Sequence, residues 1–409
     1  LNWHQWRKLA ELAEAYCGGF PLHLTTRQDM ELHNIRGRDV ATVQQGLALA
    51  GLTVFGACGD SVRNVTVCAG GEFCAGGIDT MPLAQLVQQY LQQEPVIFTL
   101  PRKFKISFSG CPKACARPWV NDLGFIAQPE GRYRVIGAGS LGAKPALGIE
   151  LYRVMPTRDV LPLCIVAVEM FESHGDRHNR HRARFRHVRE KLGDEAFRME
   201  LDARFRRVQA RRPWPGVVCE ATTSDIRPQC RLQLPDGNIT PAQAVRLADA
   251  AEPQRAVVRI DLEHGLVLYG PKPVPLPADL ADLTTAPTIV ACPGCRTCPR
   301  GLADCWTTAA KIREALPAEE LAGVRINISG CPNGCAHSSA ASIGLVGMAR
   351  TSKDGPASHY RLLVGGGNGT NATLATPRAW LHADDVPSAI RSLLQETAGN
   401  CDGLQDTKV

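Results

Sequence analysis

Hydrophobic residues recur along this chain with two periods, which predict short helices and strands in alternation. The opening stretch LNWHQWRKLAELAEAY places its apolar side chains on one face of a helix, and residues 81–93 and 302–316 repeat that pattern. Residues 104–110 (FKISFSG) and 325–330 (RINISG) alternate as short strands that end at a glycine. Short amphipathic elements of both kinds indicate a globular protein that contains helices and sheets.

The longest apolar stretches, residues 47–58 and 161–168, are short and interrupted by Gly or Pro. They fall well below the roughly 18 residues that a transmembrane helix needs. The first residues read as an amphipathic helix rather than as a signal peptide. We therefore expect no membrane span and a cytoplasmic protein.

The chain repeats itself at a shift of about 220 to 230 residues. VTVCAGGEFCAGG (65–77) matches IVACPGCRTCPRG (289–301), and ISFSGCPKACARPWVNDLGFIA (106–127) matches INISGCPNGCAHSSAASIGLVG (326–347). Residues 211–216 (RRPWPG) are rich in Pro and Gly and mark the boundary between the halves. Each half reads as a small α/β module followed by a larger α/β segment.

Eight of the sixteen cysteines fall inside the repeated segments, as C-x5-C followed more than thirty residues later by C-x3-C. Four thiolates are the ligands of a [4Fe–4S] cluster. The alternative is a structural zinc site, but zinc modules usually use C-x2-C pairs that lie close together. The recurrence of the spacing favours a cluster in each half. The predicted ligands are Cys68, Cys74, Cys111 and Cys115 in the first quartet, and Cys292, Cys298, Cys331 and Cys335 in the second.

Two other features have both a structural and a functional interpretation. Cys295 and Cys305 lie beside the second quartet and could compete as ligands, but we interpret them as small hydrophobic residues. The arginine-rich residues 174–208 could form a nucleic-acid-binding stripe. Acidic residues interleave with these arginines, however, and the net charge of the chain is only +6. We expect a solvated helical surface and no nucleic-acid partner.

Three further motifs, together with the quartets, resemble the sirohaem- and [4Fe–4S]-dependent nitrite and sulfite reductases over nearly the whole chain. LTTRQDMELH (24–33), GDSVRNV (59–65) and LPRKFK (100–105) are similar to segments that supply the active-site residues of that family. The resemblance implies that four basic residues bind and protonate the substrate, and that Gln28 and His33 contact the cofactor. The four basic residues are Arg27, Arg63, Lys103 and Lys105.

The resemblance also implies that the thiolate of Cys335 bridges a [4Fe–4S] cluster to the iron of a sirohaem. The implied fold class is α+β, a pseudo-twofold duplicated nitrite/sulfite reductase fold. In that fold, ferredoxin-like small modules accompany two α/β domains that carry the sirohaem and the iron–sulfur cluster. The expected limits are 1–55 for the first ferredoxin-like half-domain, 56–213 for the first sirohaem and 4Fe-4S domain, 214–282 for the second half-domain and 283–409 for the second large domain.

The chain departs from the family in one respect. In the familiar monomeric enzymes only the second half keeps its cluster cysteines, whereas both quartets are intact here. The substrate motifs are not duplicated, because RIDLEHGLVLYG and AGVRINIS stand where the first half has TTRQ and LPRKFK. We therefore expect two clusters. Cys335 would face the basic pocket, and Cys115, a possible second sirohaem ligand, would face residues that offer little to hold an anion.

Sulfite and nitrite lose oxygen as water while they take up electrons and protons, and paired Arg and Lys side chains suit that chemistry. We predict six-electron reduction of sulfite or nitrite, with sulfite favoured by CPNGC and by His33. No flavin, NAD or ferredoxin module is recognisable, so a separate ferredoxin or flavoprotein would donate the electrons. Two other functions stay open: a cluster oxygenase like precorrin-3B synthase, and a non-catalytic two-cluster electron-transfer protein.

Overall fold

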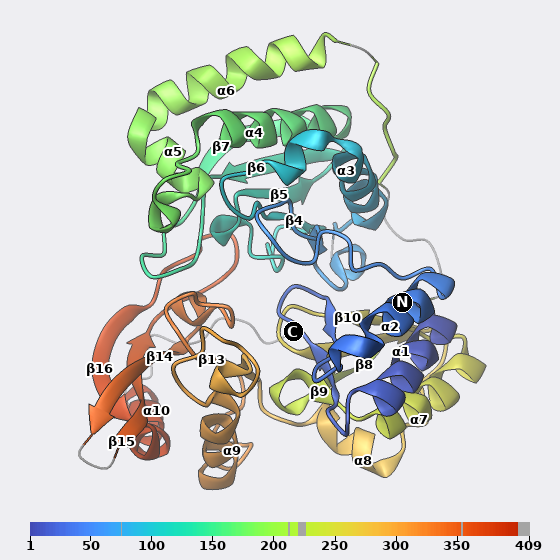
Figure 1. Cartoon of the computed structure of the whole chain (residues 1–409), viewed down its shortest axis with the longest axis vertical. Coiled ribbons are helices and arrows are strands. Elements are labelled where there is room, and N and C mark those ends of the chain that lie inside the picture. The colour runs from blue at the N-terminus through green and yellow to red at the C-terminus, as the bar shows by residue number, and fades with distance from the viewer. Residues whose placement is uncertain (75, 212, 220–225, 353–354, 400–409) are drawn as a thin grey trace.

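The computed structural model describes residues 1–399 except 75, 212, 220–225 and 353–354. The last residues of the predicted domain 283–409, from 400 onward, lie outside the described part of the chain. Figure 1 shows a large domain above, and below it a second large domain beside a small domain. The turn that contains Thr26 and Arg27, in the small domain, contacts both large domains.

The small domain combines the start of the chain with residues from its middle. Helix α1 (Trp3–Tyr16) begins after Asn2, which caps it, and packs against α7 (Pro241–Ala251). Trp6 of α1 is fully buried, and its Nε1 donates a hydrogen bond to the carbonyl of Ala244 at 2.8 Å. The helix expected from the opening stretch is therefore confirmed, and its apolar face is covered by the other half of the chain.

Two three-stranded sheets complete the small domain, with the orders β2-β1-β9 and β10-β11-β8. β1 pairs with β9 in antiparallel register, with Leu22 opposite Ile239. The two segments predicted as half-domains, 1–55 and 214–282, thus share one sheet and one hydrophobic core. The strands are β1 (Leu22–Leu24), β2 (Met30–Glu31), β8 (Arg227–Gln233), β9 (Asn238–Ile239), β10 (Val257–Ile260) and β11 (Gly265–Gly270).

The two large domains have the same sheet topology, and this confirms the duplication. Each sheet has five strands in chain order, of which the first three are parallel and the last two antiparallel. The strands of the first sheet are β3 (Thr66–Val67), β4 (Ile106–Ser109), β5 (Leu123–Gln128), β6 (Arg132–Gly137) and β7 (Ile149–Pro156). Those of the second are β12 (Ile289–Ala291), β13 (Ile326–Ser329), β14 (Ile343–Ser352), β15 (Gly355–Val364) and β16 (Thr376–His382).

Equivalent helices follow equivalent strands in the two large domains. Helices α3 (Met81–Gln93) and α9 (Cys305–Ala315) follow the C-x5-C segments, as the sequence predicts. Helices α4 (Val160–His174) and α10 (Val386–Gly399) follow the last strands. After the fourth strand the two domains also match, because each has an isolated antiparallel bridge, Ser140 with Ala146 and Gly367 with Thr373. The fold is therefore a mixed, duplicated architecture of helices and sheets.

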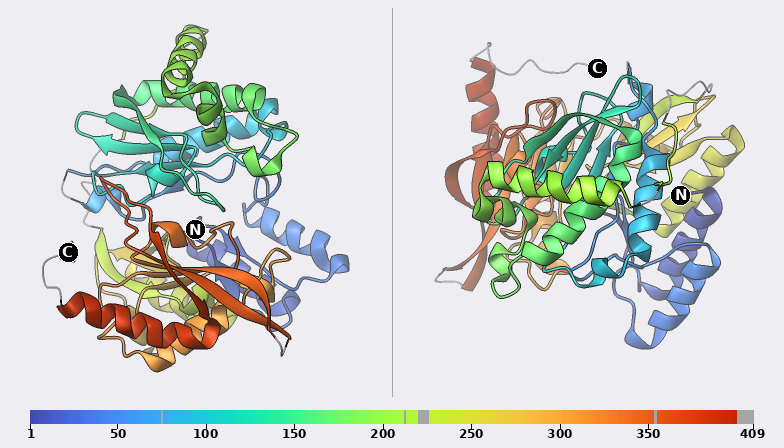
Figure 2. Two further views of the ribbon diagram at one scale, coloured as in Figure 1. Left: turned by 90° about the vertical axis from the view of Figure 1, so that its left-hand side faces the viewer. Right: turned by 90° about the horizontal axis from the view of Figure 1, so that it is seen from above.

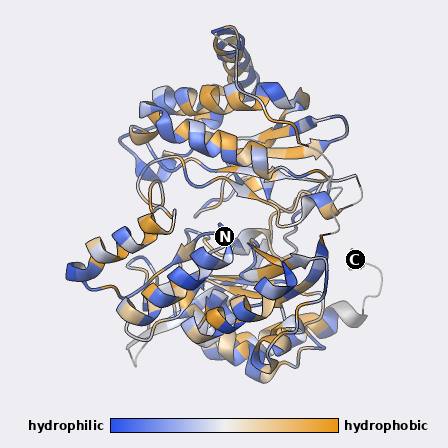
Figure 3. Ribbon diagram, turned by 90° about the vertical axis from the view of Figure 1, so that its right-hand side faces the viewer, coloured by the Kyte–Doolittle hydropathy of each residue, from blue (hydrophilic) through white to orange (hydrophobic). Residues whose placement is uncertain are grey.

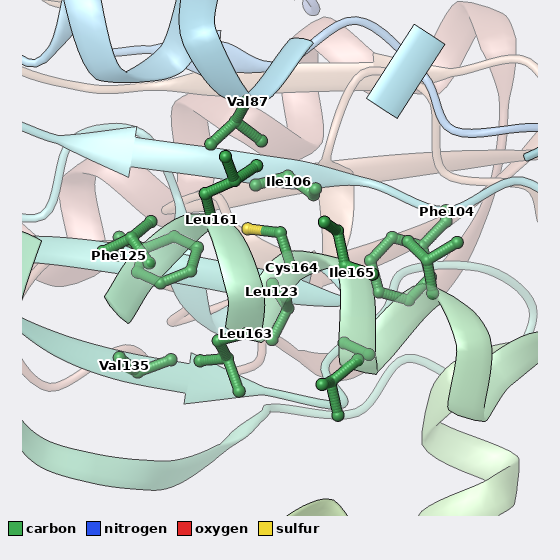
Figure 4. Close-up of a cluster of buried hydrophobic side chains, with 14 of the residues drawn as sticks. Val87, Phe104, Ile106, Leu123, Phe125, Val135, Leu161, Leu163, Cys164 and Ile165 are labelled. Carbon is green, nitrogen blue, oxygen red and sulfur yellow. The ribbon is translucent and has the colours of Figure 1, made fainter. Parts of the chain in front are cut away.

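Helix α4 contains the apolar stretch 161–168 and is the centre of the first core. Its side chains Leu161, Cys164 and Ile165 lie against strand residues such as Phe125 (Figure 4). Its outer side is covered by α5 (Phe185–Leu192) and α6 (Asp194–Gln209), which have no counterpart in the other half. A helix covered on both sides reads as continuously apolar, which explains this stretch. Within the described residues, no helix combines the length and the hydrophobicity that crossing a bilayer requires.

The outer helices alternate polar and apolar faces, whereas the strands beneath them are mostly hydrophobic (Figure 3). Helix α2 (Val40–Leu49) projects from the small domain and buries only Val43 and Leu47 (Figure 2). The short α8 (Ala278–Ala281) closes the opposite side of the small domain through the fully buried Leu280.

Candidate active site

The two cysteine quartets are built by the same local structure. In the first, the backbone N–H of Gly110 donates to Cys68 Sγ at 3.0 Å, and in the second Gly330 N donates to Cys292 Sγ at 3.1 Å. Both C-x3-C turns begin after a strand, β4 or β13, as the sequence predicts. A serine at the end of each strand accepts a hydrogen bond from the residue after the last cysteine. The two turns are therefore equivalent bond for bond.

Paired glycines bring the two cysteine segments of each quartet into contact. A Cβ on Gly71 would lie 2.6 Å from both Cys68 Sγ and Gly110 Cα. In the second quartet, a Cβ on Gly330 would lie 2.6 Å from Gly294 Cα. Only glycine allows such an approach, so each C-x5-C loop is held against its C-x3-C turn.

The donor set of each quartet fits an iron–sulfur cluster. Burial raises the pKa of Cys68 and of Cys111 to about 12, and that of Cys335 to about 11, and neighbouring cysteines add to each shift. Thiols of this kind need cations close by to ionise, and cluster irons supply that charge. Among the described residues, no three His, Cys, Asp or Glu side chains gather around one point for a single metal ion. In a four-iron cluster, each thiolate binds a different iron.

Cys305 lies beside the second quartet. It is fully buried, as expected, but its Sγ is also 4.0 Å from Cys292 Sγ. That sulfur contact is the main cause that lowers the pKa of Cys292 to about 7. Cys295, in contrast, is exposed, so the expectation of a buried hydrophobic residue is wrong for this position.

The turn after β1 reaches across to the second quartet. Thr26 Oγ1 donates to the carbonyl of Cys335 at 2.8 Å, which ties the TTRQ segment to the last cysteine of that quartet. Next to it, Arg27 Nη2 donates to the carbonyl of Asn64 at 2.6 Å, and Arg27 Nη1 lies 3.4 Å from Asn121 Oδ1. The TTRQ and RNV motifs, which lie in different domains, are thus in direct contact.

Both lysines of LPRKFK lie on the Cys335 side. Burial lowers the pKa of Lys103, while the nearby Cys335 opposes that shift. Burial lowers the pKa of Lys105 well below its ordinary value, and the adjacent cations Arg27 and Lys103 add to the shift. Arg27 is also shifted, since burial lowers its pKa to about 10. Cations held close together without solvent favour an anionic guest.

Arg63 lies farther out, in a basic pocket at the surface. Its guanidinium donates to the carbonyls of Ala57 and Gly59, the latter at 2.8 Å, so its own loop holds it. The pocket is lined by Gly59, Asp60, Arg63, Arg102, Lys103, Arg180 and Arg300. Arg102, Arg180 and Arg300 were not predicted as site residues. Arg102 lies inside LPRKFK and Arg300 follows Cys298 by two residues, so their positions next to motif residues could have indicated them.

The segment 174–208 has two roles. In its helical part Arg189 and Arg204 stay partly exposed and pair with acidic side chains, as expected, whereas Arg186 is buried and pairs with Glu190. The residues before α5 differ, however. Arg180 lines the basic pocket and pairs with Asp60 at 2.7 Å, while Arg184 enters the interior. The expectation of a solvated surface is therefore wrong for Arg184 and Arg186.

Gln28 has protein partners at both ends of its amide, whereas His33 has only a nearby carboxylate. Gln28 Oε1 accepts from Val67 N at 2.9 Å, and its Nε2 donates to the carbonyl of Ile260 at 2.8 Å. Gln28 thereby joins β3, just before Cys68, to the small domain. His33 Nε2 lies 3.2 Å from Glu31 Oε2.

The first quartet faces a turn of the same shape but with inverted charge. Thr25 Oγ1 accepts from the N–H groups of residues 27 and 29, and Asp261 Oδ1 accepts likewise from residues 263 and 265. Glu263 therefore occupies the position of Arg27, and it pairs with Arg325, the equivalent of Lys105, at 3.2 Å. An acidic residue beside Cys115 opposes anion binding, which agrees with the predicted asymmetry.

The two C-x3-C turns meet at the centre of the molecule. Arg117 and His337 follow Cys115 and Cys335 by two residues, and both have left-handed backbone conformations with φ of 56° and 62°. The guanidinium of Arg117 hydrogen-bonds Nδ1 of His337, and its Nη2 lies 3.2 Å from Glu263 Oε1. Equivalent positions of the repeat thus contact each other.

Comparison with known proteins agrees with this architecture. The family model for the nitrite and sulphite reductase 4Fe-4S domain matches residues 58–208 and 284–396, and the model for the nitrite/sulfite reductase ferredoxin-like half domain matches residues 1–50. The structure of the Mycobacterium tuberculosis NirA protein superposes with a TM-score of 0.81, at 20% identity, over 100% of this chain and 80% of that one. The two proteins share a fold.

Several curated proteins are similar over nearly the whole chain. The assimilatory ferredoxin-dependent nitrite reductase of Haloferax mediterranei is 28% identical over 97% of this chain and 77% of its own length. The ferredoxin–nitrite reductase of Leptolyngbya laminosa is 29% identical over 97% and 84%. The sulfite reductase [NADPH] hemoprotein beta-component of Acidithiobacillus ferrooxidans is 28% identical over 98% and 80%. The chain therefore belongs to the nitrite and sulfite reductase family of oxidoreductases.

Proposed function

We propose that this protein catalyses the six-electron reduction of a small oxyanion, nitrite to ammonia or sulfite to sulfide. The observation that carries the proposal is the convergence of the TTRQ, RNV and LPRKFK motifs on the Cys335 side of the second quartet. A cationic interior pocket beside a redox cofactor can bind an oxyanion and neutralise the charge of its reduced intermediates.

The four basic residues have separable roles in this proposal. Arg27 and Lys105, which lie deepest, hold the anion by charge-assisted hydrogen bonds. Lys103, whose pKa is lowered by burial, releases a proton more readily than a free lysine and can protonate an oxygen that leaves as water. Arg63 guards the mouth of the pocket, where the anion enters.

We further propose that each quartet holds a [4Fe–4S] cluster and that Cys335 also ligates a sirohaem iron. The cofactors would store and deliver the electrons. Arg102, Arg180 and Arg300 in the surface pocket would neutralise carboxylates of the tetrapyrrole. Cys115 is the corresponding ligand for a second sirohaem, and this second site would be structural, because Glu263 faces it where Arg27 faces the first.

The preferred anion is proposed from the relatives. Those similar over 97% of the chain include enzymes named ferredoxin-dependent nitrite reductases, whereas the short matches at CPNGC and His33 favoured sulfite. We propose that the enzyme reduces both anions and has the higher kcat/KM for nitrite. The electron donor is proposed to be a separate ferredoxin, as those names state for the relatives.

The domain limits 1–55, 56–213, 214–282 and 283–409 are part of the proposal, with both half-domains acting as one body. Two measurements on the purified protein test the function. The first counts iron, acid-labile sulfide and tetrapyrrole per chain. The second measures steady-state consumption of nitrite and of sulfite with a low-potential chemical reductant.

We expect eight cluster irons and turnover of at least one anion. A protein with about four cluster irons refutes the two-cluster proposal but leaves the reductase intact. A protein with full cofactor content that consumes neither anion refutes the reductase and favours an electron-transfer or oxygenase role.

A further inference from the structure

One buried carboxylate lies among the interior cations Arg27, Lys105 and Arg184. The side chain of Asp122 has no exposed surface. Arg184, also largely buried, donates from Nη2 to Asp122 Oδ2 at 2.7 Å. Arg27 and Lys105 lie close enough to feel these charges, since Asp122 raises the pKa of Arg27 and Arg184 lowers that of Lys105, although burial dominates both shifts. Asp29 also acts on Arg27, but Asp122 is the carboxylate that pairs directly with Arg184 and bonds the backbone of Lys105.

Asp122 also hydrogen-bonds the backbone of Lys105 at the edge of the sheet where β4 and β5 begin. Lys105 N donates to Asp122 Oδ2 at 2.8 Å, and Asp122 N donates to the carbonyl of Lys105 at 3.0 Å. Because β4 and β5 are parallel, both begin at this edge. The reciprocal bonds therefore fix the position of the first residues of β4 relative to those of β5. The backbone position from which Lys105 extends is therefore set by Asp122.

Three segments that are distant in sequence meet at this carboxylate. Lys105 belongs to LPRKFK, Asp122 directly precedes β5, and Arg184 directly precedes α5. The neighbouring Asn121 Oδ1 lies 3.4 Å from Arg27 Nη1, which links the TTRQ turn to the same point. A change at Asp122 would thus reach all three segments.

These residues also carry polar atoms that the protein itself does not pair. Arg27 Nε, Arg184 Nε and Asp122 Oδ1 are buried and have no hydrogen-bond partner within the described chain. Two unpaired donors and one unpaired acceptor call for a guest that both accepts and donates hydrogen bonds. A water molecule bound to an oxyanion, or a protonated oxyanion, has that property.

The other half of the duplication lacks this acid. By the repeat of residues 106–127 and 326–347, Ser342 stands where Asp122 does, and Arg325 stands where Lys105 does. In that half the carboxylate comes instead from Glu263 on the turn, which occupies the position of Arg27. The residue just before the third strand is therefore a carboxylate on the side of Arg27 and Lys105, and a serine on the side of Glu263 and Arg325.

We propose that Asp122, with Arg184, is the positioning residue of the oxyanion pocket: it holds Lys105 and Arg27 in the geometry that binds and protonates the substrate. The inference rests on the proposed reductase function. Asp122 does not itself transfer an electron or a proton to the substrate in this role. It acts through the two cations and through the backbone of β4.

The test uses the holoenzyme with Asp122→Asn, which keeps the shape of the side chain but removes its charge. We expect kcat for nitrite to fall about 100-fold, the scale of a misplaced reactive group, with iron and tetrapyrrole content unchanged. Arg184→Gln should lower kcat similarly, and the double variant should lose little more than the worse single variant, because both changes break the same unit. Should Asp122→Asn fail to fold, Arg184→Gln carries the test alone.

Asp236→Asn is the matched control, since Asp236 is a largely buried carboxylate paired with Arg313 at 2.9 Å outside the pocket. It should keep kcat within about threefold of wild type. If Asp122→Asn keeps kcat to the same extent, or loses activity only in proportion to lost iron and tetrapyrrole, the positioning role is overturned. A wild-type enzyme that reduces neither nitrite nor sulfite instead refutes the function on which the inference rests.

Discussion

Arg117 and Arg325 both pair with Glu263, so they allow a buried ion pair and an exposed one to be compared at the same acceptor. Both lie 3.2 Å from the same oxygen, Glu263 Oε1, but their side chains are 3% and 54% exposed. Removing one partner of a buried ion pair costs about 3–5 kcal/mol, whereas an exposed pair contributes about 0–1 kcal/mol. We therefore predict that Arg117→Met destabilises the protein far more than Arg325→Met, although the two distances are equal.

Arg117→Met should lower the free energy of unfolding by about 3 kcal/mol, the lower end of that range, because Glu263 keeps Arg325 as a partner. At about 2–4 °C per kcal/mol, the midpoint of thermal unfolding should fall by about 6–12 °C, against at most about 4 °C for Arg325→Met. The assay is thermal unfolding of the holoenzyme at one fixed scan rate, with iron content measured on each variant.

A second variant separates the lost pair from the lost side chain. Glu263→Gln added to Arg117→Met removes the carboxylate that the first change leaves poorly paired, so it should restore part of the midpoint. Equal shifts for Arg117→Met and Arg325→Met would contradict the reasoning, since burial would then not determine the strength of the pair. A larger shift for Arg325→Met would contradict it more strongly.

Three further changes address the site itself. Cys335→Ser should lose the tetrapyrrole, half of the cluster iron and all anion reduction, and activity that persists would exclude Cys335 as the bridging ligand. Lys103→Ala should keep both cofactors but slow anion reduction about 100-fold, the scale of removing one acid–base group; an unchanged rate would place proton delivery elsewhere. Burial and the adjacent cations Arg27, Lys103 and Arg184 lower the pKa of Lys105, and Cys335 opposes them more weakly. As pH rises, Lys105 therefore loses its positive charge below the usual pKa of about 10.4. kcat/KM should therefore decline on the alkaline side, and Lys105→Arg, which stays charged, should move that decline to higher pH; pH profiles that coincide would show that Lys105 does not titrate in turnover.

Local patterns were sufficient to predict the secondary structure and the duplication. The periodicity of residues 81–93 and 104–110 reports local burial, and the structure forms α3 and β4 there. The repeated cysteine spacings are also local, so they predicted equivalent turns. The shared core of the small domain was not predicted, because pairing of β1 with β9 depends on residues more than 200 positions apart.

The missing site residues have a similar explanation. Asp122 carries no motif of its own, since its role comes from its position at the entry of one strand beside the entry of the next. Arg184 lies in a segment whose composition indicated a solvated surface, and only tertiary packing turns it inward. Charge alone cannot distinguish an arginine that pairs on a helix surface from one that enters a pocket. The charge inversion at Glu263 became visible only when the two turns could be compared by their hydrogen bonds.

The interleaved small domain has a consequence for how the protein is made. Trp6 packs on Ala244, 238 residues later in the chain. A ribosome that adds about 5–20 residues per second needs on the order of ten to fifty seconds to bridge that interval. During that time α1 and β1 have only the neighbouring α2 and β2 as partners, and the faces that α7 and β9 cover stay open. Separate synthesis of the two halves would therefore leave each with an open part of the shared core.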